Sequence, residues 1–255
     1  MRRGRLILVP NTLDFGIAGA AAPLDDLLPR STLRAAAALS HWVVENAKSA
    51  RAFLKRVDAV QPLATPVQGL QMQELPRPPK GGKASIPTEQ WQALLAPLRQ
   101  GLDLGLLSEA GLPAVADPGS NLVAQAHREG FEVLTLAGAS SLVLALAASG
   151  LQGQSFAFIG YLPVEATARS ARIRELEQRS RKEGQTQIAI ETPYRNQALL
   201  EALLAALQEG SQLSVSRALT TAEAWTRSAR VADWRRQPSS LPGDQPAIFS
   251  WLASA

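Results

Sequence analysis

The sequence predicts an α/β protein made of two α/β domains. Short continuous apolar runs, typical of strands buried on both faces of a parallel sheet, alternate with amphipathic stretches of helical period. Glycines stand where several helical stretches end. The chain has 255 residues, 46% hydrophobic and 19% charged, which is enough for one large or two modest domains and unlike a disordered or fibrous chain.

The first part of the chain supplies four predicted strands and four predicted helices. The strands are expected at residues 6–9, 42–44, 104–107 and 131–136. The helices are expected at residues 47–57, about 87–100, 122–129 and 140–149. Ser85 or Thr88 is the expected cap of the second helix, and Gly101 is expected to end it.

A polar, glycine-rich stretch at residues 150–154 follows the apolar helix and marks the expected domain boundary. We therefore expect an N-terminal α/β domain at residues 1–152 and a C-terminal α/β domain at 153–255. In the second domain, strands are expected at residues 156–159, 187–191, 213–218 and 247–252, and helices at 167–183 and 196–207.

Composition excludes several kinds of chemistry. Without cysteine there is no disulfide, thiolate metal site or cysteine nucleophile, and two histidines cannot form a three-histidine metal site. We predict no metal site. The apolar run after the first arginines is too short for a signal peptide, and no stretch approaches the roughly 20 apolar residues of a membrane span, so a soluble cytoplasmic protein is expected.

Two loops rich in small residues follow neighbouring predicted strands: SEAGLPAVADPG at residues 108–119 and LAGASS at 136–141. Open α/β sheets bind ligands beyond the carboxyl ends of their strands. Gly111 has no Cβ, so a ligand can approach the backbone closely there. The loops therefore predict one shared pocket, with two tight turns as the alternative.

Five motifs then recur in order: the two loops above, ASGL at residues 148–151, FIGYLP at 158–163 and ETPYR at 191–195. Together they resemble the tetrapyrrole methylase superfamily, and within it the branch of small-subunit ribosomal-RNA 2′-O-ribose methyltransferases. The resemblance implies a two-domain α/β enzyme, usually a homodimer, that binds S-adenosylmethionine in a cleft between its domains.

The resemblance also assigns residues to the cofactor. The methionine part would contact Ala110, Gly111 and Leu112, with Val115 nearby. Ser140 and Ser141 match a small polar pair of the family. The adenosine would be held by Thr192, Tyr194, Ser214, Pro246, Ala247 and Ile248, partly through their backbone groups.

The chain departs from this branch where the family places its substrate. Residues 9–16 read VPNTLDFG instead of a turn resembling ATPIGNL, and residues 45–51 read ENAKSAR where the branch carries EDTR. Three functions stay open: methyl transfer to ribosomal RNA or the small ribosomal subunit, methyl transfer to a small molecule such as a tetrapyrrole, and non-catalytic binding of S-adenosylmethionine.

Glu45 and Glu109 are the candidate catalytic carboxylates, because each follows a buried apolar strand and a ribose hydroxyl must lose a proton when it is methylated. A helix cap or an ion pair with Arg51 is the alternative. Glu191 is expected to orient Arg195 or to close the domain interface.

The chain carries a net charge of +4, which favours an anionic partner. Arginines that could contact RNA phosphates recur in the second half, although interspersed glutamates also fit a solvated, ion-paired face. They are Arg169, Arg172, Arg174, Arg179, Arg181, Arg227, Arg230, Arg235 and Arg236. A basic loop at residues 75–85 is either a surface loop or a substrate-contacting arm.

Overall fold

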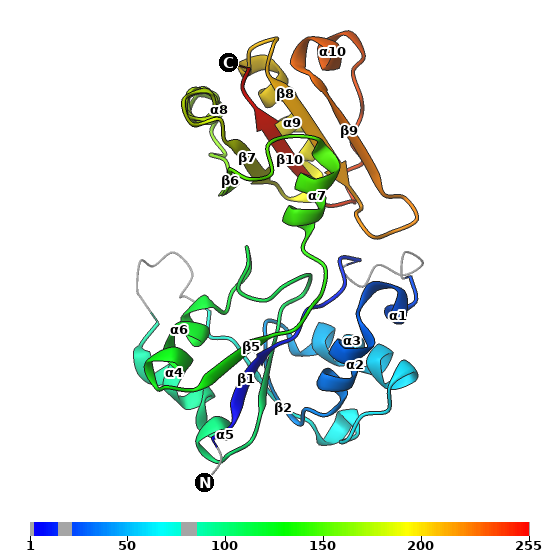
Figure 1. The fold of residues 1–255 in the computed structure, drawn as a ribbon, viewed down its shortest axis with the longest axis vertical. Helices are drawn as coiled ribbons and strands as arrows, with labels where there is room; N and C mark the ends of the chain where they lie inside the picture. The colour runs from blue at the N-terminus through cyan, green and yellow to red at the C-terminus, as the bar shows by residue number, and fades with distance from the viewer. Residues whose placement is uncertain (1–2, 15–21, 78–85, 255) are drawn as a thin grey trace. The chain divides into compact units, whose positions relative to one another are not determined.

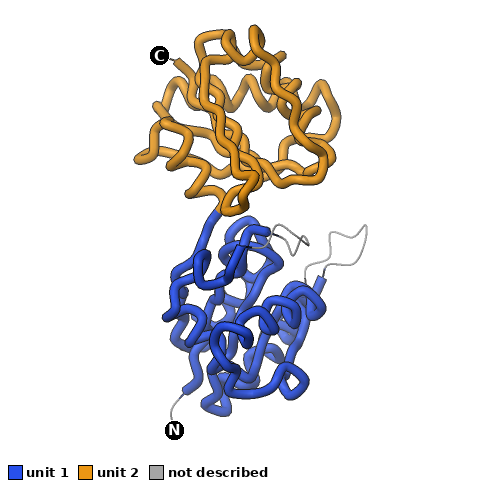
Figure 2. The backbone as a smooth tube through the Cα atoms, turned by 90° about the vertical axis from the view of Figure 1, so that its right-hand side faces the viewer, with its two compact units in different colours: residues 1–140 blue, residues 141–255 orange. Residues whose placement is uncertain are grey.

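The computed structural model describes residues 3–14, 22–77 and 86–254. The chain divides into two compact units, Met1–Ser140 and Ser141–Ala255, coloured separately in Figure 2. Each unit contains one five-stranded sheet with helices, which confirms the predicted class of two α/β domains.

The sheet of the first unit is entirely parallel, in the order β3-β2-β4-β1-β5. Its strands β1, β2 and β5 are labelled in Figure 1. Its strands are β1 (Arg5–Leu8), β2 (His41–Val44), β3 (Gln71–Glu74), β4 (Leu104–Leu107) and β5 (Glu132–Thr135). Because all five strands run the same way, the loops at their carboxyl ends gather along one edge of the sheet.

Helices cover both faces of this sheet. They are α1 (Leu24–Leu27), α2 (Arg30–Ala37), α3 (Ala47–Val60), η1 (Val67–Gly69), α4 (Thr88–Leu94), α5 (Ala96–Arg99) and α6 (Ser120–Arg128). Strand β1 alternates between two cores, with Ile7 facing Phe53 and Leu54 of α3, while Leu6 joins Trp91 and Leu122 on the other side. This double burial explains the continuous apolar run of β1.

The second unit has a mixed sheet in the order β6-β7-β10-β8-β9. Its strands are β6 (Phe156–Tyr161), β7 (Thr186–Ile190), β8 (Gln212–Arg217), β9 (Trp225–Arg230) and β10 (Ala247–Leu252). Only β6 and β7 pair in parallel; the remaining pairs are antiparallel. The helices are α7 (Ser141–Ser149), α8 (Ala166–Glu183), η2 (Pro193–Arg195), α9 (Asn196–Ala206) and α10 (Val231–Arg236).

Helix α7 belongs to the second unit, so the compact units divide before this helix, whereas the expected boundary at residue 152 follows it. The reason is packing: Leu142 and Leu146 are buried against Ile188 of β7 and Ile248 of β10. An apolar helix next to a boundary can join either neighbouring core, and its sequence does not say which.

The helix expected at about residues 87–100 is two helices, α4 and α5. Pro97 interrupts it, because proline has no N–H to donate and, in a continuous helix, its ring would clash with the carbonyl group four residues earlier. The expected cap also differs: Pro87 occupies the N-cap position without a side-chain hydrogen bond, and Thr88 is the first helical residue. Ser85 lies outside the described residues.

Within the described part of the chain, none of the helices combines the length and the apolar character needed to cross a bilayer.

Candidate active site

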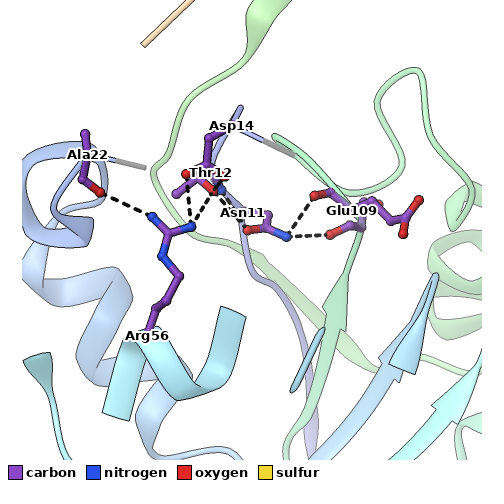
Figure 3. A network of polar contacts seen from close by, with 7 residues as sticks. Asn11, Thr12, Asp14, Ala22, Arg56 and Glu109 are labelled. Atoms are coloured by element: carbon purple, nitrogen blue, oxygen red, sulfur yellow. Dashed lines mark hydrogen bonds and ion pairs between the residues drawn. The ribbon is translucent and has the colours of Figure 1, made fainter. Parts of the chain in front are cut away.

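Asn11 joins two loops at the carboxyl edge of the first sheet (Figure 3). Its backbone N–H donates to Gly111 O at 2.9 Å, and Gly111 N donates back to Thr12 O at 3.2 Å. Its side-chain Nδ2 donates to Ser108 O and Glu109 O, both at 3.0 Å. The side chain is buried, so these bonds fix the loop after β4 against the loop after β1.

The loop after β1 is held in turn by helix α3. Arg56 Nη1 lies 3.0 Å from Asp14 Oδ2, and Thr12 Oγ1 donates to Asp14 Oδ1 at 2.7 Å. Arg56 Nη2 donates to Ala22 O at 3.3 Å (Figure 3). The Asp14 side chain is 2% exposed, and a carboxylate so deeply buried requires such a partner.

Three carboxylates gather above the ends of β2 and β4. The two predicted catalytic residues are brought together, because Glu109 N donates to Glu45 Oε2 at 3.1 Å. Asp117, in the same loop as Glu109, is the third member. Burial, which is the largest cause, and the negative charges of Glu45 and Glu109 together raise the pKa of Asp117 to about 7.

The alternatives for Glu45 are a helix cap and an ion pair with Arg51, and neighbouring groups take both roles. Asn46 caps α3, its Oδ1 accepting from Lys48 N at 2.9 Å and from Ser49 N at 3.3 Å. Arg51 donates to Ala47 O at 3.3 Å. Arg77, one of the three described residues of the basic loop, donates to Glu45 O at 3.2 Å. Residues 78–85 of that loop lie outside the described residues.

The loop after β4 has a strained backbone. Gly111, Ala114, Ala116 and Gly119 all have positive φ, with values of 62°, 66°, 63° and 129°. Alanine rarely adopts this left-handed conformation, and each such residue costs roughly 1–2 kcal/mol. Strain of this kind clusters at functional sites, and here it bends the loop so that Asp117 returns towards Glu109.

The predicted cofactor residues of the first unit lie on this loop and the one after β5. Ala110 and Gly111 are buried, Leu112 is half-buried and Val115 is exposed. A Cβ on Gly111 would meet Ala139 O at 3.5 Å, and one on Gly138 would meet Pro10 Cβ at 2.3 Å. The structure therefore brings residues 110–111 close to the segment that leads to Ser140, as a shared pocket requires.

In the second unit, the residues assigned to adenosine fall into two groups. Thr192 and Tyr194 follow β7 and lie beside the segment that enters β10, where Pro246, Ala247 and Ile248 stand: Asn196 Nδ2 donates to Gln245 O at 2.9 Å. Ser214 lies apart, paired with Ser250 within the sheet and buried on the face that α7 covers. Ser141 begins α7.

Other predicted contacts are resolved clearly. Arg195 Nη2 lies 3.1 Å from Glu191 Oε2, an ion pair that is compatible with the expectation that Glu191 orients this arginine. The arginines of α8 are partly ion-paired along the helix, as Arg172 with Glu175 at 2.6 Å and Arg179 with Glu183 at 3.2 Å. This pattern favours the solvated, ion-paired face over a ready phosphate-binding surface.

A pocket of about 340 Å³ adjoins the carboxylates. One wall comes from the loop after β1 and another from the first turns of α3, and Glu109 closes it. No group of three or more histidine or acidic side chains suited to a metal ion occurs within residues 3–14, 22–77 and 86–254.

The fold and this edge of the sheet define a class of protein. The family model described as tetrapyrrole (corrin/porphyrin) methylases matches residues 30–233. The chain belongs to this family, as the five motifs predict.

Two curated relatives with the same name are similar to this chain. It is 37% identical over 129 residues to ribosomal RNA small subunit methyltransferase I of Vibrio cholerae, covering 51% of this chain and 43% of that protein. It is 31% identical over 189 residues to the protein of the same name from Pseudomonas aeruginosa, covering 74% and 58%. The chain spans about half the length of the curated relatives it matches.

Solved structures support the fold. The methyltransferase CobJ superposes with a TM-score of 0.55 at 17% identity, covering 100% of this chain and 95% of that one. Uroporphyrin-III C-methyltransferase from Thermus thermophilus gives 0.52 at 20% identity, covering 98% and 92%.

Proposed function

We propose that this protein is an S-adenosylmethionine-dependent methyltransferase whose acceptor is a ribose 2′-hydroxyl of small-subunit ribosomal RNA. The observation that carries the proposal is the cluster of Glu45, Glu109 and Asp117 at the carboxyl edge of the first sheet. The names of the curated relatives support the RNA acceptor.

The residues present fit the cofactor. S-adenosylmethionine has an amino-acid part, a sulfonium cation and an adenosine, so it needs hydrogen-bonding groups at both ends and negative charge near the middle. Among the described residues, buried Ser108 Oγ and Asn196 Oδ1 have no hydrogen-bond partner. Ser108 precedes the segment 110–112, and Asn196 is bonded to the residue before Pro246, so each proposed binding segment has an unused polar atom beside it.

We assign the cofactor contacts accordingly. Ala110, Gly111, Leu112, Val115 and Ser140 would hold the amino-acid part, with Ser141 following them. Thr192, Tyr194, Pro246, Ala247 and Ile248 would hold the adenosine. Because α7 covers Ser214, we expect its substitution to act through packing within the sheet.

When bound, S-adenosylmethionine supplies a methyl group on a positively charged sulfur, and transfer of that group to an oxygen releases the hydroxyl proton. Asp117 is the best placed of the three carboxylates to accept this proton, because its pKa of about 7 suits a base working near neutral pH. Burial of Asp117 keeps that pKa raised, and the charges of Glu45 and Glu109 add to the effect. Asn11 keeps the loop carrying Glu109 in place.

Labelled methyl transfer tests the proposal. Total RNA and a metabolite extract, both from a strain lacking this protein, are incubated with the protein and labelled S-adenosylmethionine. We expect label in small-subunit RNA. Label only in the metabolite fraction would establish a small-molecule acceptor, and binding of S-adenosylhomocysteine without any transfer would establish a non-catalytic binding protein.

Asp117→Asn should lower kcat at least about a hundredfold, the usual contribution of a general base, with little effect on binding of S-adenosylhomocysteine. Asp25→Asn, at an exposed position of α1, is the matched control and should retain full activity. Equal activity of the two variants would remove Asp117 as the base.

The proposal extends to a homodimer that acts in the cytoplasm, as the family resemblance implies. Light scattering of the purified protein measures its oligomeric state, and fractionation of cells measures its location.

A further inference from the structure

Helix α7 is apolar on its outer side as well as on the side that packs. Leu142 and Leu146 are buried in the core of the second unit. On the opposite side, Val143, Leu144 and Ala147 are exposed. A helix that is hydrophobic all round is normally buried in a core or in an interface. The outer side of α7 therefore lacks the polar residues expected of a helix surface in contact with water.

Strand β6 adds aromatic side chains on the sheet face that α7 covers. Phe158 packs in the same apolar cluster as α7. Tyr161 is paired with Ile190 of that cluster, because a bulge in β6 restores the alternation of its side chains, and Phe156 lies two residues before Phe158. All three aromatic side chains thus point to one face. Because α7 packs over β8, β9 and β10, these side chains at the edge of the sheet stay half-buried or exposed.

The outer side of α7 and this face of β6 form an uncharged surface, called the α7–β6 surface below (both elements are labelled in Figure 1). Its residues are Val143, Leu144, Ala147, Ala148, Phe156, Phe158 and Tyr161. No charged residue occurs in the stretch 133–164, although 19% of the chain is charged. The opposite edge strand, β9, carries Arg227 and Arg230, charges of the kind that protect sheet edges from association. Exposed aromatic residues without charges are typical of the core of a protein–protein interface.

The same composition argues against two other occupants. RNA carries a phosphate on every nucleotide and is bound largely through cations, which the stretch 133–164 lacks. A helix that lies on a membrane surface has a strongly charged side opposite its apolar side, and α7 has no such side. The remaining match is a protein surface that is itself apolar and uncharged.

We infer that a second copy of this chain docks on the α7–β6 surface, so that the same surface of both copies meets around a two-fold axis. On the premise of the proposed homodimer, this surface forms its contact. A two-fold interface must be complementary to itself, and an uncharged apolar surface brings no like charges together. Among the described residues of the first unit, the exposed large apolar side chains are Val60, Leu102 and Val115, on three separate segments. The bulge in β6 interrupts its backbone ladder, so the copies meet through side chains rather than by strand pairing.

Docking of the second copy affects the proposed cofactor site. Ser141, one of the proposed cofactor contacts, is the first residue of α7. Leu142 and Leu146 hold the helix on its inner side, and the second copy holds it on its outer side. Dimer formation and cofactor binding therefore favour each other, and by linkage each strengthens the other by the same factor.

The chain offers matched control variants. Leu144 on the α7–β6 surface is 38% exposed, and Leu102 in the first unit is 39% exposed. A glutamate at each position makes the same change at the same exposure, inside and outside the inferred interface. Val143 and Val60 are likewise exposed valines of α7 and α3. Because the chain has no cysteine, a single cysteine at either position reports on that position alone.

Sedimentation velocity measures the dissociation constant of the dimer, and calorimetry measures the affinity for S-adenosylhomocysteine. Leu144→Glu should raise the dimer dissociation constant at least about a hundredfold, because the substitution acts in both copies, about tenfold in each. Its affinity for S-adenosylhomocysteine should fall about fivefold, while Leu102→Glu behaves as the wild type in both measurements. Thiol labelling of Val143→Cys should slow as the protein concentration rises through the dissociation constant, and labelling of Val60→Cys should not change.

Each failure has its own signature. If the wild type is a dimer but Leu144→Glu and Leu102→Glu dimerise equally, docking on the α7–β6 surface is overturned and the homodimer uses another surface. If the wild type methylates RNA as a monomer at every concentration, the docking inference fails and the proposed reaction stands. A dimeric wild type that neither binds S-adenosylhomocysteine nor transfers methyl would instead overturn the proposed function.

Two further results would correct parts of the inference. Labelling of Val143→Cys that slows with small-subunit ribosomal RNA, or with vesicles of phosphatidylcholine and phosphatidylglycerol, but not with protein concentration would overturn docking of a second copy in favour of that partner. Equal affinity of the dimeric wild type and monomeric Leu144→Glu for S-adenosylhomocysteine would overturn the link to the cofactor.

Circular dichroism and thermal unfolding check the folding of all four variants. Each substituted side chain is exposed, so we expect the fold to tolerate the changes. If Leu144→Glu does not fold, the concentration dependence of Val143→Cys labelling decides the question alone.

Discussion

Asp117 is partly buried beside two other carboxylates, and this has consequences for stability as well as for chemistry. Its raised pKa means that, over a range of pH, the folded protein binds a proton that the unfolded chain has released. The negative charge that the proposed reaction needs is therefore unfavourable in the folded state, a common relation between activity and stability.

The pH dependence of stability tests this relation. Between the ordinary pKa of 3.8 and the raised value of about 7, the folded state holds more protons, so the free energy of unfolding falls as the pH rises. We expect this group to make the protein less stable at pH 8 than at pH 5 by on the order of 1 kcal/mol, after discounting for its partial exposure.

Urea unfolding of the wild type and Asp117→Asn at both pH values measures that contribution, and the variant should lack it. The same ionisation predicts that kcat/KM of the wild type rises as the pH passes through about 7. A pH dependence of stability identical in both proteins would show that Asp117 has an ordinary pKa.

Asn11→Ala tests the connection between the loops. The substitution leaves Ser108 O and Glu109 O without their donor, which costs about 1–3 kcal/mol when the group is buried. Because Glu109 would also lose its fixed position, we expect kcat to fall more than KM rises. Thermal unfolding and steady-state kinetics measure the two effects, and unchanged kinetics in a destabilised variant would limit Asn11 to a structural role.

The sequence located part of this site. Glu45 and Glu109 follow apolar strands, and that position alone predicts that they meet at the sheet edge. Asp117 stands eight residues after Glu109. Its position near Glu109 depends on residues with left-handed backbone conformation, such as Ala114 and Ala116, and the sequence shows no periodic pattern that would predict this conformation. Asp117 within ADPG was nevertheless a visible signal, since it is the only acid between Gly111 and Gly119.

At the scale of elements, Gly105 shows how tightly β4 packs in its sheet. A Cβ at this position would lie 2.5 Å from Trp42 Cε3, and Trp42 is fully buried on β2. We expect Gly105→Ala to lower the free energy of unfolding by about 1–3 kcal/mol through overpacking. Gly153→Ala, with nothing within 4 Å of its Cβ, should change it little; equal unfolding midpoints would contradict this reading of the packing.

Strands with apolar sequences were predictable, including the edge strands β5 and β6, and two polar edge strands were not. Strands β1 and β4 read as apolar runs because both faces are covered. Strand β3, with the sequence QMQE, and strand β9, with WTRSAR, stand at sheet edges and are mostly exposed or half-buried. Their polar side chains carry no strand signal, because backbone pairing to a single neighbour holds them in place.

At the scale of the whole molecule, the two units have separate cores, so each is expected to fold by itself. Fragments 141–255 and 153–255 distinguish the observed division from the boundary expected at residue 152. Without α7, the second fragment exposes Ile188 and Ile248, so it should be less stable by several kcal/mol or fail to fold. Equal denaturation midpoints of the two fragments would show that α7 contributes little to this unit.

Strand β1 precedes both of its partner strands in the sequence, yet it lies inside its sheet, with Leu6 paired to Leu104 on one side and to Val133 on the other. During synthesis on the ribosome, this apolar strand emerges long before either neighbour exists. The first unit can complete its sheet only after β5 has left the exit tunnel, so this apolar strand stays without its neighbours until β4 and β5 have been synthesised. A protein with this strand order is an expected client of chaperones that bind nascent chains.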